Sequence, residues 1–339
     1  MTTRSFGNNF EVVDQTASLL KLPQTWSILN DSGLFVQEPI TTRTATFQEI
    51  NGTLGVVGDQ VPGTKPQTQL GDVRKIHSYS CTFHSMEDAL YPNDISGKSS
   101  YSDLNAADTE AAALLRKLEK MRKSFAVTRE IARFKTLGTG SVWSPNSTVS
   151  GNFYTDFGIT RKEVDFVLST ATTDIVSKCE EIIASFQASA NDGVVITEVI
   201  AYCSPAFFGK LISHAKVQAA YTYYQATEGQ SILRNRAGGA GLYRRFSYAG
   251  ITFIEVATVL AGQTLVTSGD AIFVAKADDA GFVTYTAPPN RFGYENTFGE
   301  FEYAWTFREP RMTQITVEME MSMLNVLKRP NFVARGYTA

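Results

Sequence analysis

The sequence predicts an α+β fold with elongated parts, and three observations lead to that prediction. Residues 103–136 carry a long helical pattern, the segments 36–90 and 300–323 alternate like strands, and a buried strand passes directly into a helix within residues 193–224. With 339 residues, the chain is long enough for two domains or for one large domain with insertions. Hydrophobic residues make up 43% and charged residues 19%, so the chain can bury a core.

Bulk composition argues against several classes of protein. The formal net charge of -3 gives no overall basic footprint for nucleic acid, and no run approaches the roughly 18 apolar residues that a membrane span needs. The start of the chain has no apolar signal-peptide core. Cys81, Cys179 and Cys203 are odd in number and widely spaced, which argues against a disulfide framework. We therefore expect synthesis in a reducing, cytoplasmic compartment.

The first two elements are an arm and a hairpin. Residues 1–35 are polar and lack sustained periodicity, which predicts an extended arm that needs a partner surface to become ordered. In residues 36–90, two strand-like segments, "EPITTRTATFQEI" and "VRKIHSYSCTFHSM", flank a tip that holds five Gly and two Pro in 22 residues. A tip of this length is uncommon in a compact monomer and is typical of binding or of disorder.

Residues 103–136 form the clearest predicted helix. Asp103 is the expected N-cap, Gly138 follows the expected end, and the helix would approach about 50 Å at about 1.5 Å per residue. Such a length indicates the backbone of an elongated molecule. The apolar stripe of this helix consists of Ala107, Ala111, Leu114, Leu118, Met121, Phe125 and Ala132.

The same helix is strongly basic, with eight basic residues against two acidic ones between Arg116 and Lys135. One interpretation is a solvated face on which Lys and Arg stems lie along the surface. The other is contact with an acidic partner, either protein or nucleic acid. The residues of this candidate basic face are Arg116, Lys120 and Lys123, opposite the apolar stripe, and Arg129 and Arg133, which flank it.

The second half of the chain reads as a mixed α/β module. Residues 161–190 predict a second helix, loosened by its Ser and Thr content. A buried strand over 194–202 leads to a helix for which Ser204 is the expected N-cap and Pro205 the first residue. The segments "FSYAGITFIEVAT" and "GDAIFVAKADDAGFVTYTAPPNRF" predict further strands, and two closing strands are broken at Pro310.

A Gly-rich loop, "RNRAGGAGLYRR", precedes the first of those strand segments. It lacks both G-x-G-x-x-G and the Walker lysine pattern, and no tight helix start follows it. Phosphate binding is one interpretation, and we favour a mobile loop that contacts another subunit. Its arginines are Arg234, Arg236, Arg244 and Arg245.

No pattern indicates a metal or a catalytic centre. On a strand, His77 and Cys81 share one face while His84 points to the other, and no fourth ligand stands nearby. His214 has no Ser or Cys nucleophile pattern beside it. We expect neither enzyme activity nor a cofactor.

The closing segment alternates between apolar and polar residues from Ile315 to Met323. A triplet of Met319, Met321 and Met323 could be thioether ligands for Cu(I), but a half-buried strand explains all nine positions. We expect the Met side chains to pack against the long helix. Glu318 and Glu320 would then face outward or toward a neighbour.

The order of these elements resembles the major capsid proteins of tailed bacteriophages, which share the Hong Kong 97-like fold, and most of all the lambda-type (major capsid protein E) family. The resemblance is clearest over 192–339. It rests on "VVITEVIAYCSPAFFGKLISHAKVQAAY", "YRRFSYAGITFIEVAT", "DAIFVAKADDAGFVTYTAPPNR" and "REPRMTQITVEMEMSMLNVLKRPNFVARG". Over residues 1–150 the order and character of the elements match more than the residues do.

The resemblance implies a division of the chain. It comprises an N-terminal arm (1–35), an extended hairpin loop (36–90), a peripheral domain (91–194) with a spine helix at 103–136, an axial domain (195–305), and closing strands with a C-terminal tail (306–339). The hairpin loop would lie over a neighbouring subunit, and the arginines of the Gly-rich loop would lie near the capsomer centre. Subunit-contact candidates in the hairpin loop are Arg43, Asp59, Lys65, Asp72, Arg74 and Lys75.

The resemblance also implies a function. The subunit would form hexamers and pentamers of an icosahedral shell around double-stranded DNA, held without sequence specificity, in a virion assembled in the host bacterial cytoplasm. Expected partners are portal and scaffolding proteins and a decoration or cement protein, with no membrane. Nothing like a fused scaffolding domain precedes the arm, so we expect a separate scaffold. Some members of the fold crosslink Lys to Asn, for which Lys65, Lys75 and Lys98 are candidates, but the lambda-type likeness favours a cement protein instead.

Three other functions are weighed against this one. A nanocompartment shell of the encapsulin type would have the same fold but would enclose a protein cargo. A metabolic α/β enzyme would need a pocket with paired polar groups, for which the sequence offers no pattern. A DNA-binding protein using the basic stretch 116–135 is disfavoured by the net charge of -3.

Overall fold

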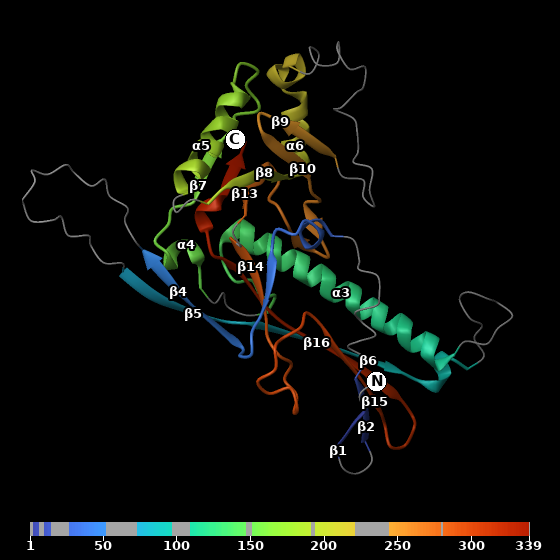
Figure 1. The fold of residues 1–339 in the computed structure, drawn as a ribbon. Helices are drawn as coiled ribbons and strands as arrows, with labels where there is room; N and C mark the ends of the chain where they lie inside the picture. The colour runs from blue at the N-terminus through green and yellow to red at the C-terminus, as the bar shows by residue number, and fades with distance from the viewer. Residues whose placement is uncertain are drawn as a thin grey trace, which may run out of the picture.

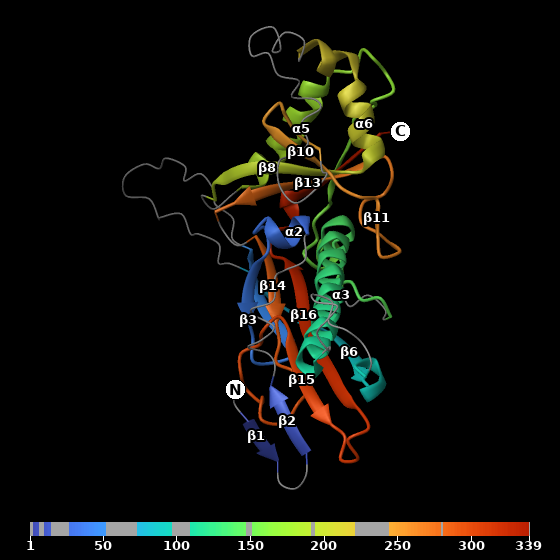
Figure 2. The same ribbon diagram turned by 90° about the vertical axis from the view of Figure 1, so that its right-hand side faces the viewer.

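The computed structural model describes residues 3–6, 10–14, 27–51, 73–96, 109–146, 151–190, 194–220, 244–278 and 281–338. Within them the chain forms two large sheets and one long helix (Figure 1). A seven-stranded sheet lies along the helix α3 (Glu110–Thr139), and a six-stranded sheet lies beyond the C-terminal end of that helix (Figure 2). The predicted α+β class and elongated shape are confirmed.

Strand β16 is the centre of the seven-stranded sheet. It pairs antiparallel with β6 on one side and with β15 and β14 on the other. Beyond these, β3 pairs in parallel with β14, and β2 and β1 extend the sheet past β15. The strands are β1 (Thr3–Phe6), β2 (Phe10–Asp14), β3 (Val36–Pro39), β6 (Thr82–Leu90), β14 (Phe282–Thr286), β15 (Tyr303–Arg308) and β16 (Ile315–Leu327).

Strands β14 and β15 lie one after the other along the same edge of β16. The last residue of β14, Thr286, is opposite Met323, and the first residue of β15, Tyr303, is opposite Glu320. Between them, residues 287–302 leave the sheet and return to it. The chain therefore builds a long excursion in the middle of what would otherwise be one strand.

Helix α3 begins and ends later than its pattern predicted. Thr109 is its N-cap, with Oγ1 accepting from the amide of Ala112 at 3.2 Å, whereas Asp103 lies outside the described residues. The expected stop at Gly138 is wrong, because the helix continues through it to Thr139 and is capped by Gly140, which has a φ of +69°. A Cβ on Gly140 would lie 2.2 Å from the Tyr154 ring, so this position requires glycine.

The apolar stripe of α3 packs on one face of β16. A second core, separate from the larger one, joins the two elements; it consists of Leu118, Met121, Phe125 and Ala132 from α3 with Val317, Met319, Met321 and Met323 from β16, and Ala304 from β15. All three methionines are at most 1% exposed. The prediction that the Met triplet packs against the long helix is confirmed, and flexible thioether side chains suit the irregular gap between a helix and a twisted sheet.

The six-stranded sheet follows the order β7-β17-β13-β8-β10-β9. Helices α5 (Ile175–Ser189) and α6 (Pro205–Ser213) lie over one side, and α2 (Ile28–Asp31) and the end of α3 lie on the other (Figure 2). As predicted, Ser204 caps α6 and accepts from the amide of Phe207. The strands are β7 (Lys162–Asp165), β8 (Ile196–Cys203), β9 (Arg245–Tyr248), β10 (Ile251–Glu255), β13 (Asp270–Ala277) and β17 (Val333–Tyr337).

The second helix predicted over 161–190 is wrong in its first half. Residues 162–165 form β7, which pairs in parallel with β17, and the helix α5 begins only at Ile175. Asp174 is its N-cap and accepts from the amide of Val176 at 3.1 Å. The six-stranded sheet therefore does not coincide with the range 195–305 of the expected axial domain. It includes β7 and β17 from outside that range, while β14 from within the range belongs to the seven-stranded sheet.

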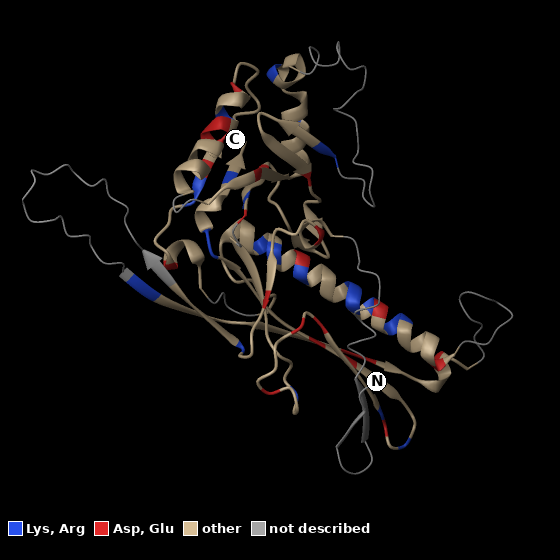
Figure 3. Ribbon diagram, in the orientation of Figure 1, with Lys and Arg blue, Asp and Glu red and all other residues tan. Residues whose placement is uncertain are grey.

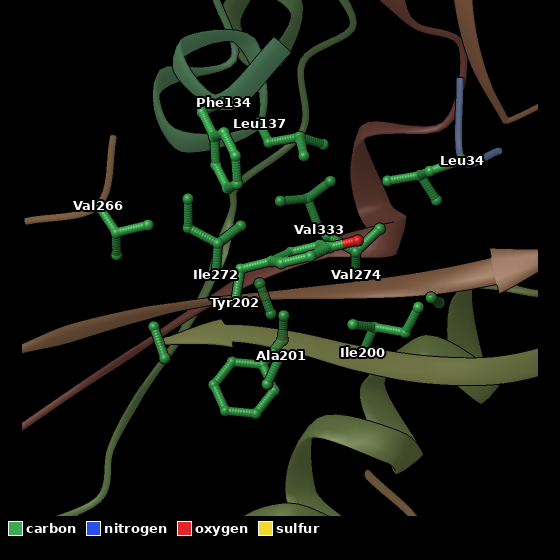
Figure 4. Close-up of a cluster of buried hydrophobic side chains, with 14 of the residues drawn as sticks. Leu34, Phe134, Leu137, Ile200, Ala201, Tyr202, Val266, Ile272, Val274 and Val333 are labelled. Atoms are coloured by element: carbon green, nitrogen blue, oxygen red, sulfur yellow. The ribbon is translucent and has the colours of Figure 1, made fainter. Parts of the chain in front are cut away.

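The two sheets share one continuous hydrophobic core at the end of α3. Phe134 and Leu137 of α3 point onto β8 and β13 of the six-stranded sheet (Figure 4). The Phe134 and Tyr202 rings meet edge to face, with centroids 5.6 Å apart. Because both side chains are fully buried, the spine helix and the six-stranded sheet form a single packed unit.

A separate two-stranded hairpin projects from this body (Figure 1). Strands β4 (Thr44–Asn51) and β5 (Val73–Ser80) pair antiparallel, as the alternating segments predicted. The remaining short elements of the described chain are α4 (Phe153–Asp156), the pair β11 (Val259–Leu260) and β12 (Gln263–Thr264), a helical turn at 215–220, and 3-10 turns at Pro92–Asp94 and Pro330–Phe332.

Candidate intersubunit surfaces

One face of the β4–β5 hairpin is fixed to the body by aromatic rings. Tyr79 stacks on Phe47 with centroids 5.6 Å apart and meets Phe153 of α4 edge to face at 5.2 Å. Its hydroxyl donates to Asp156 Oδ2 at 2.5 Å, and His77 lies edge-on to Phe157 at 4.8 Å. A two-stranded hairpin is only marginally stable alone, so α4 sets the direction in which this one projects.

The predicted contact residues of the hairpin lie on both of its faces, because side chains alternate along a strand. Arg74 and Lys75 are exposed, and Ile76 beside them is 69% exposed. Arg43 is also exposed, with its guanidinium carbon 5.1 Å from the centroid of the Phe83 ring. Asp59, Lys65 and Asp72 lie outside the described residues. The described part of the hairpin therefore carries exposed basic side chains.

The candidate basic face of α3 divides into two groups. Figure 3 shows Lys and Arg positions recurring along α3. Lys120 and Lys123 are exposed, and Arg116 is half-buried. Arg129 and Arg133 are only 8% and 3% exposed, so their assignment to an outer basic face is wrong. Their partners lie far away in the sequence, which is why helical periodicity alone placed them incorrectly.

Arg129 and Arg133 are held by polar groups inside the subunit. Arg129 Nη2 donates to Glu302 Oε1 at 2.8 Å. Arg133 donates to Asn30 Oδ1 at 2.8 Å and to Thr284 Oγ1 at 3.1 Å. Burial lowers the pKa of Arg133 to about 10, and the neighbouring Arg129 charge acts in the same direction.

Glu130, between these arginines, ties the start of α2 to α3. Its carboxylate accepts from the amides of Ile28, Leu29 and Asn30 at 2.8 to 3.0 Å. Burial raises the pKa of Glu130, against the effect of these donors and of Arg133. The point at which residues 27–31 join the body is thereby fixed by one buried carboxylate.

The arginines predicted for the Gly-rich loop differ in their contacts and exposure. Arg244 donates from Nε and Nη2 to the two oxygens of Glu255, each at 2.6 Å, and lies 5.0 Å from the centroid of the Phe208 ring. Arg245 is exposed on β9. Arg234 and Arg236 lie outside the described residues.

The polar face of β16 is covered within the subunit, which corrects the expectation that Glu318 and Glu320 face outward. Glu320 is 7% exposed. Arg291, from the excursion 287–302, forms ion pairs with both carboxylates, and its guanidinium carbon lies 4.3 Å from the centroid of the Trp305 ring. From Met319 onward both faces of this strand are therefore buried, so the prediction of a half-buried strand is wrong there, whereas Ile315, Thr316 and Glu318 are partly exposed.

Sequence reasoning overlooked that excursion. It contains N-x-F-G twice, at 290–293 and 296–299, and this short repeat is the signal that could have singled it out. Phe292 is 85% exposed and Phe298 is 70% exposed. They are among the most exposed large apolar side chains in the described part of the molecule.

The His and Cys residues that raised the metal question are packed as ordinary strand residues. Burial raises the pKa of the Cys81 thiol to about 12 and lowers the pKa of His84. No group of three or more His, Cys, Asp or Glu side chains within the described ranges is arranged to hold a metal ion. Likewise, none of the helices in those ranges has the length and apolar content of a membrane span.

Comparison with known proteins decides the family. The family model described as phage major capsid protein E matches residues 11–338. The chain belongs to this family. It is 35% identical to the major capsid protein of Pseudomonas phage KPP10, over 99% of both chains, and 26% identical to that of Salmonella phage Felix O1, over 98% of this chain and 97% of that one.

Solved capsid structures show the fold of this capsid protein. A chain of the cyanophage P-SCSP1u capsid matches with a TM-score of 0.53 at 13% identity, covering 99% of this chain and 92% of that chain. A chain of the mature capsid of bacteriophage PhiM1 matches with a TM-score of 0.52 at 14% identity, covering 90% and 85%. The Hong Kong 97-like fold and the lambda-type family resemblance are confirmed. This capsid protein is a structural component of the virion that assembles with copies of itself into a shell.

Proposed function

We propose that this capsid protein forms hexamers and pentamers of an icosahedral phage head that encloses double-stranded DNA, and that the head assembles in the bacterial cytoplasm. The observation that carries the proposal is the β4–β5 hairpin, which projects from the body with its outer face and strand edges free of described contacts. Exposed strand edges bury little within one subunit and can bury much between subunits.

The hairpin would lie over a neighbouring subunit. Rings of the body already cover the face beside Tyr79, so contact would use the exposed side chains of the hairpin, among them Arg43, Arg74 and Lys75. Asp59, Lys65 and Asp72 belong to the same proposed contact loop through their place in the sequence. Changing Arg74 and Lys75 together to Glu would weaken assembly while leaving the unfolding of isolated subunits unchanged.

The basic residues that remain on the surface of α3 support contact with an acidic partner. Arg116, Lys120 and Lys123 remain on the helix surface after the two buried arginines are removed from the set. A cluster of Lys and Arg side chains attracts an acidic scaffolding protein during assembly or the phosphates of packaged DNA, without sequence specificity. Lys120→Glu combined with Lys123→Glu would test this face, with Lys210→Glu on α6 as an exposed control.

The division into arm, hairpin loop, peripheral domain and axial domain is part of the same proposal. In it, residues 91–194 are the peripheral domain with α3 as its spine, and residues 195–305 are the axial domain, whose Arg245 would lie near the capsomer centre. A portal protein, a separate scaffold and a cement protein complete the proposed set of partners.

Negative-stain microscopy tests the proposal directly. The protein, co-expressed with the other head genes, would give icosahedral shells, and the isolated protein would give capsomer rings or sheets. DNA inside the shells supports a phage head, whereas shells that hold a protein cargo and no DNA would favour a nanocompartment. Uniformly small particles under assembly conditions would contradict both.

A further inference from the structure

The excursion 287–302 is a rigid platform that displays two aromatic side chains. It leaves the sheet after β14, crosses the face of β16 that is opposite to α3, and returns as β15. Its two N-x-F-G units place Phe292 and Phe298 at equivalent positions six residues apart. Both rings are exposed, at 85% and 70%.

Arg291 and Gly299 fix the platform next to each phenylalanine. Arg291, directly before Phe292, is paired with Glu318 and Glu320 and lies over the Trp305 and Phe307 rings. Gly299, directly after Phe298, is buried; its carbonyl accepts from Thr286 Oγ1 at 2.9 Å, and a Cβ there would lie 2.3 Å from the Thr286 carbonyl oxygen. The backbone beside each exposed ring is therefore held tightly.

Two exposed rings on one fixed loop are unlike the single apolar residues that are scattered over any protein surface. Ordering a loop and leaving its two largest apolar side chains in water gives no stability to the isolated subunit. Glu295 and Glu300, in the same loop, are exposed as well. The surface is thus an apolar pair with an acidic rim, and a partner for it needs an apolar pocket with a basic rim.

The same chain carries such a pocket at the far end of the seven-stranded sheet. A cavity of about 410 Å³ is lined mainly by apolar side chains, namely Leu90, Tyr91, Pro92, Ile95, Met312 and Ile315. Arg308 and Glu110 line it as well and form an ion pair with each other, so the exposed Arg311 beside Met312 gives the rim its positive charge. Met312 is 79% exposed and has a φ of +54°, an unfavourable conformation for a non-glycine residue that hydrogen bonds of the turn hold in place.

The platform and the pocket of one subunit do not meet. Strand β15 runs between them, with Tyr303 at the platform end and Arg308 at the pocket end, a separation of about 17 Å at roughly 3.3 Å per residue. The ion pairs of Arg291 also hold the platform on its own sheet. Any pairing of the two surfaces must therefore join different subunits.

We propose that Phe292 and Phe298 of one subunit insert into the Leu90–Met312 pocket of a neighbouring copy in the shell. Glu295 and Glu300 then face Arg311 of that copy, while Arg308 keeps its own pair with Glu110. The proposed contact is head-to-tail, the platform of each subunit meeting the pocket of the next, and this type of interface can close into rings. The inference rests on self-assembly into a shell, and it adds which residues form one of the contacts.

Photo-crosslinking in assembled shells tests the proposed contact. Phe298 is replaced by p-benzoylphenylalanine, which keeps an aromatic ring, and shells are assembled from mixed isotope-labelled and unlabelled subunits. Irradiation is expected to join residue 298 of one copy to residues 90–95 or 308–315 of another copy. Crosslinks confined to one copy, crosslinks elsewhere, or none in intact shells would overturn the proposal. The same probe at Val259, which is 53% exposed on β11, is the control and should not reach that pocket.

Two sets of substitutions provide an independent readout. Phe292→Ser with Phe298→Ser should abolish shells while the subunit unfolds at the wild-type temperature, since both rings are exposed, and Val259→Ser should leave shells intact. Glu295→Arg and Arg311→Glu should each reduce shell yield, and the two together should restore it. Wild-type protein without shells would refute the proposed function. Normal shells from the double Ser variant would refute this inference alone.

Discussion

Arg129 and Glu302 form a buried ion pair between residues that lie 173 positions apart in the chain. Arg129 Nη2 is 2.8 Å from Glu302 Oε1, and the two side chains are 10% and 8% exposed. Arg122 Nε approaches the same carboxylate at 3.5 Å. This pair joins the middle of α3 to the start of β15, so the long helix is held to the seven-stranded sheet by charge as well as by its apolar stripe.

Removing that carboxylate should strongly destabilise the subunit. Glu302→Ala leaves two buried guanidinium groups without their anion, for an expected loss of about 3 to 5 kcal/mol in the free energy of unfolding. Denaturant unfolding of unassembled subunits measures it. The control is Glu181→Ala, which breaks the pair with Lys162 at 2.7 Å, where both side chains are at least 40% exposed, for an expected loss below about 1 kcal/mol. Equal losses in the two variants would contradict the assignment of a buried network.

Glycine at the end of α3 should resist substitution. Gly140→Ala places a methyl group against the Tyr154 ring in a backbone conformation with φ near +69°. The conformation alone costs about 1 to 2 kcal/mol, and the crowding adds about 1 to 3 kcal/mol. Gly158→Ala, with φ of +64° and no atom within 4 Å of the added Cβ, isolates the first contribution. Thermal unfolding of both variants should rank Gly140→Ala as the less stable, and the reverse order would show that Tyr154 moves away freely.

Substitutions in the Met triplet should affect stability through packing and not through metal binding. Met321→Asp buries an unpaired carboxylate in the core between α3 and β16, which costs several kcal/mol and should abolish assembly. Met321→Leu keeps the volume and should cost less than about 1.5 kcal/mol, with shells still formed. Copper chelators should leave shells unchanged in electron micrographs. Disruption by chelation would show that the thioethers have a second role.

The buried thiols should make the subunit less stable in alkaline solution. Burial raises the pKa of Cys179 from 9.0 to about 12, so the folded thiol stays protonated where the unfolded thiol ionises. Between pH 9 and 12 the unfolded state binds fewer protons, so stability falls with rising pH, by about 1.4 kcal/mol per pH unit for this group. Below pH 9 that contribution is constant.

Cys179→Ala provides the measurement. The free energy of unfolding is measured at pH 7.5 and 10.5 for the variant and for the wild type. It should fall less between the two pH values in the variant. The lost side-chain volume lowers the stability of the variant equally at both pH values and does not affect this difference. An identical pH slope in the two proteins would mean that the Cys179 thiol ionises in the folded state as readily as in the unfolded one.

The sequence by itself determined the elements whose pattern is local. The spacing of Leu118, Met121 and Phe125 predicted a helix with one buried stripe, and the alternation around Met321 predicted a strand. Ser204 and Pro205 predicted the start of α6 because a side-chain cap and a fixed φ act within one helical turn. Together with the order of elements, these signals were enough for the fold class and the family.

Only the tertiary structure decided which surfaces are free. Arg129 and Arg133 look exposed by periodicity, but Glu302, Asn30 and Thr284 reach them from distant parts of the chain. Likewise, residues 162–165 have a helical composition and become β7 because β17 offers a parallel strand partner. The polar face of β16 is buried because Arg291 crosses it. Contacts between distant segments leave no period in the sequence, so charge patterns alone could not separate internal ion pairs from the surfaces that meet other subunits.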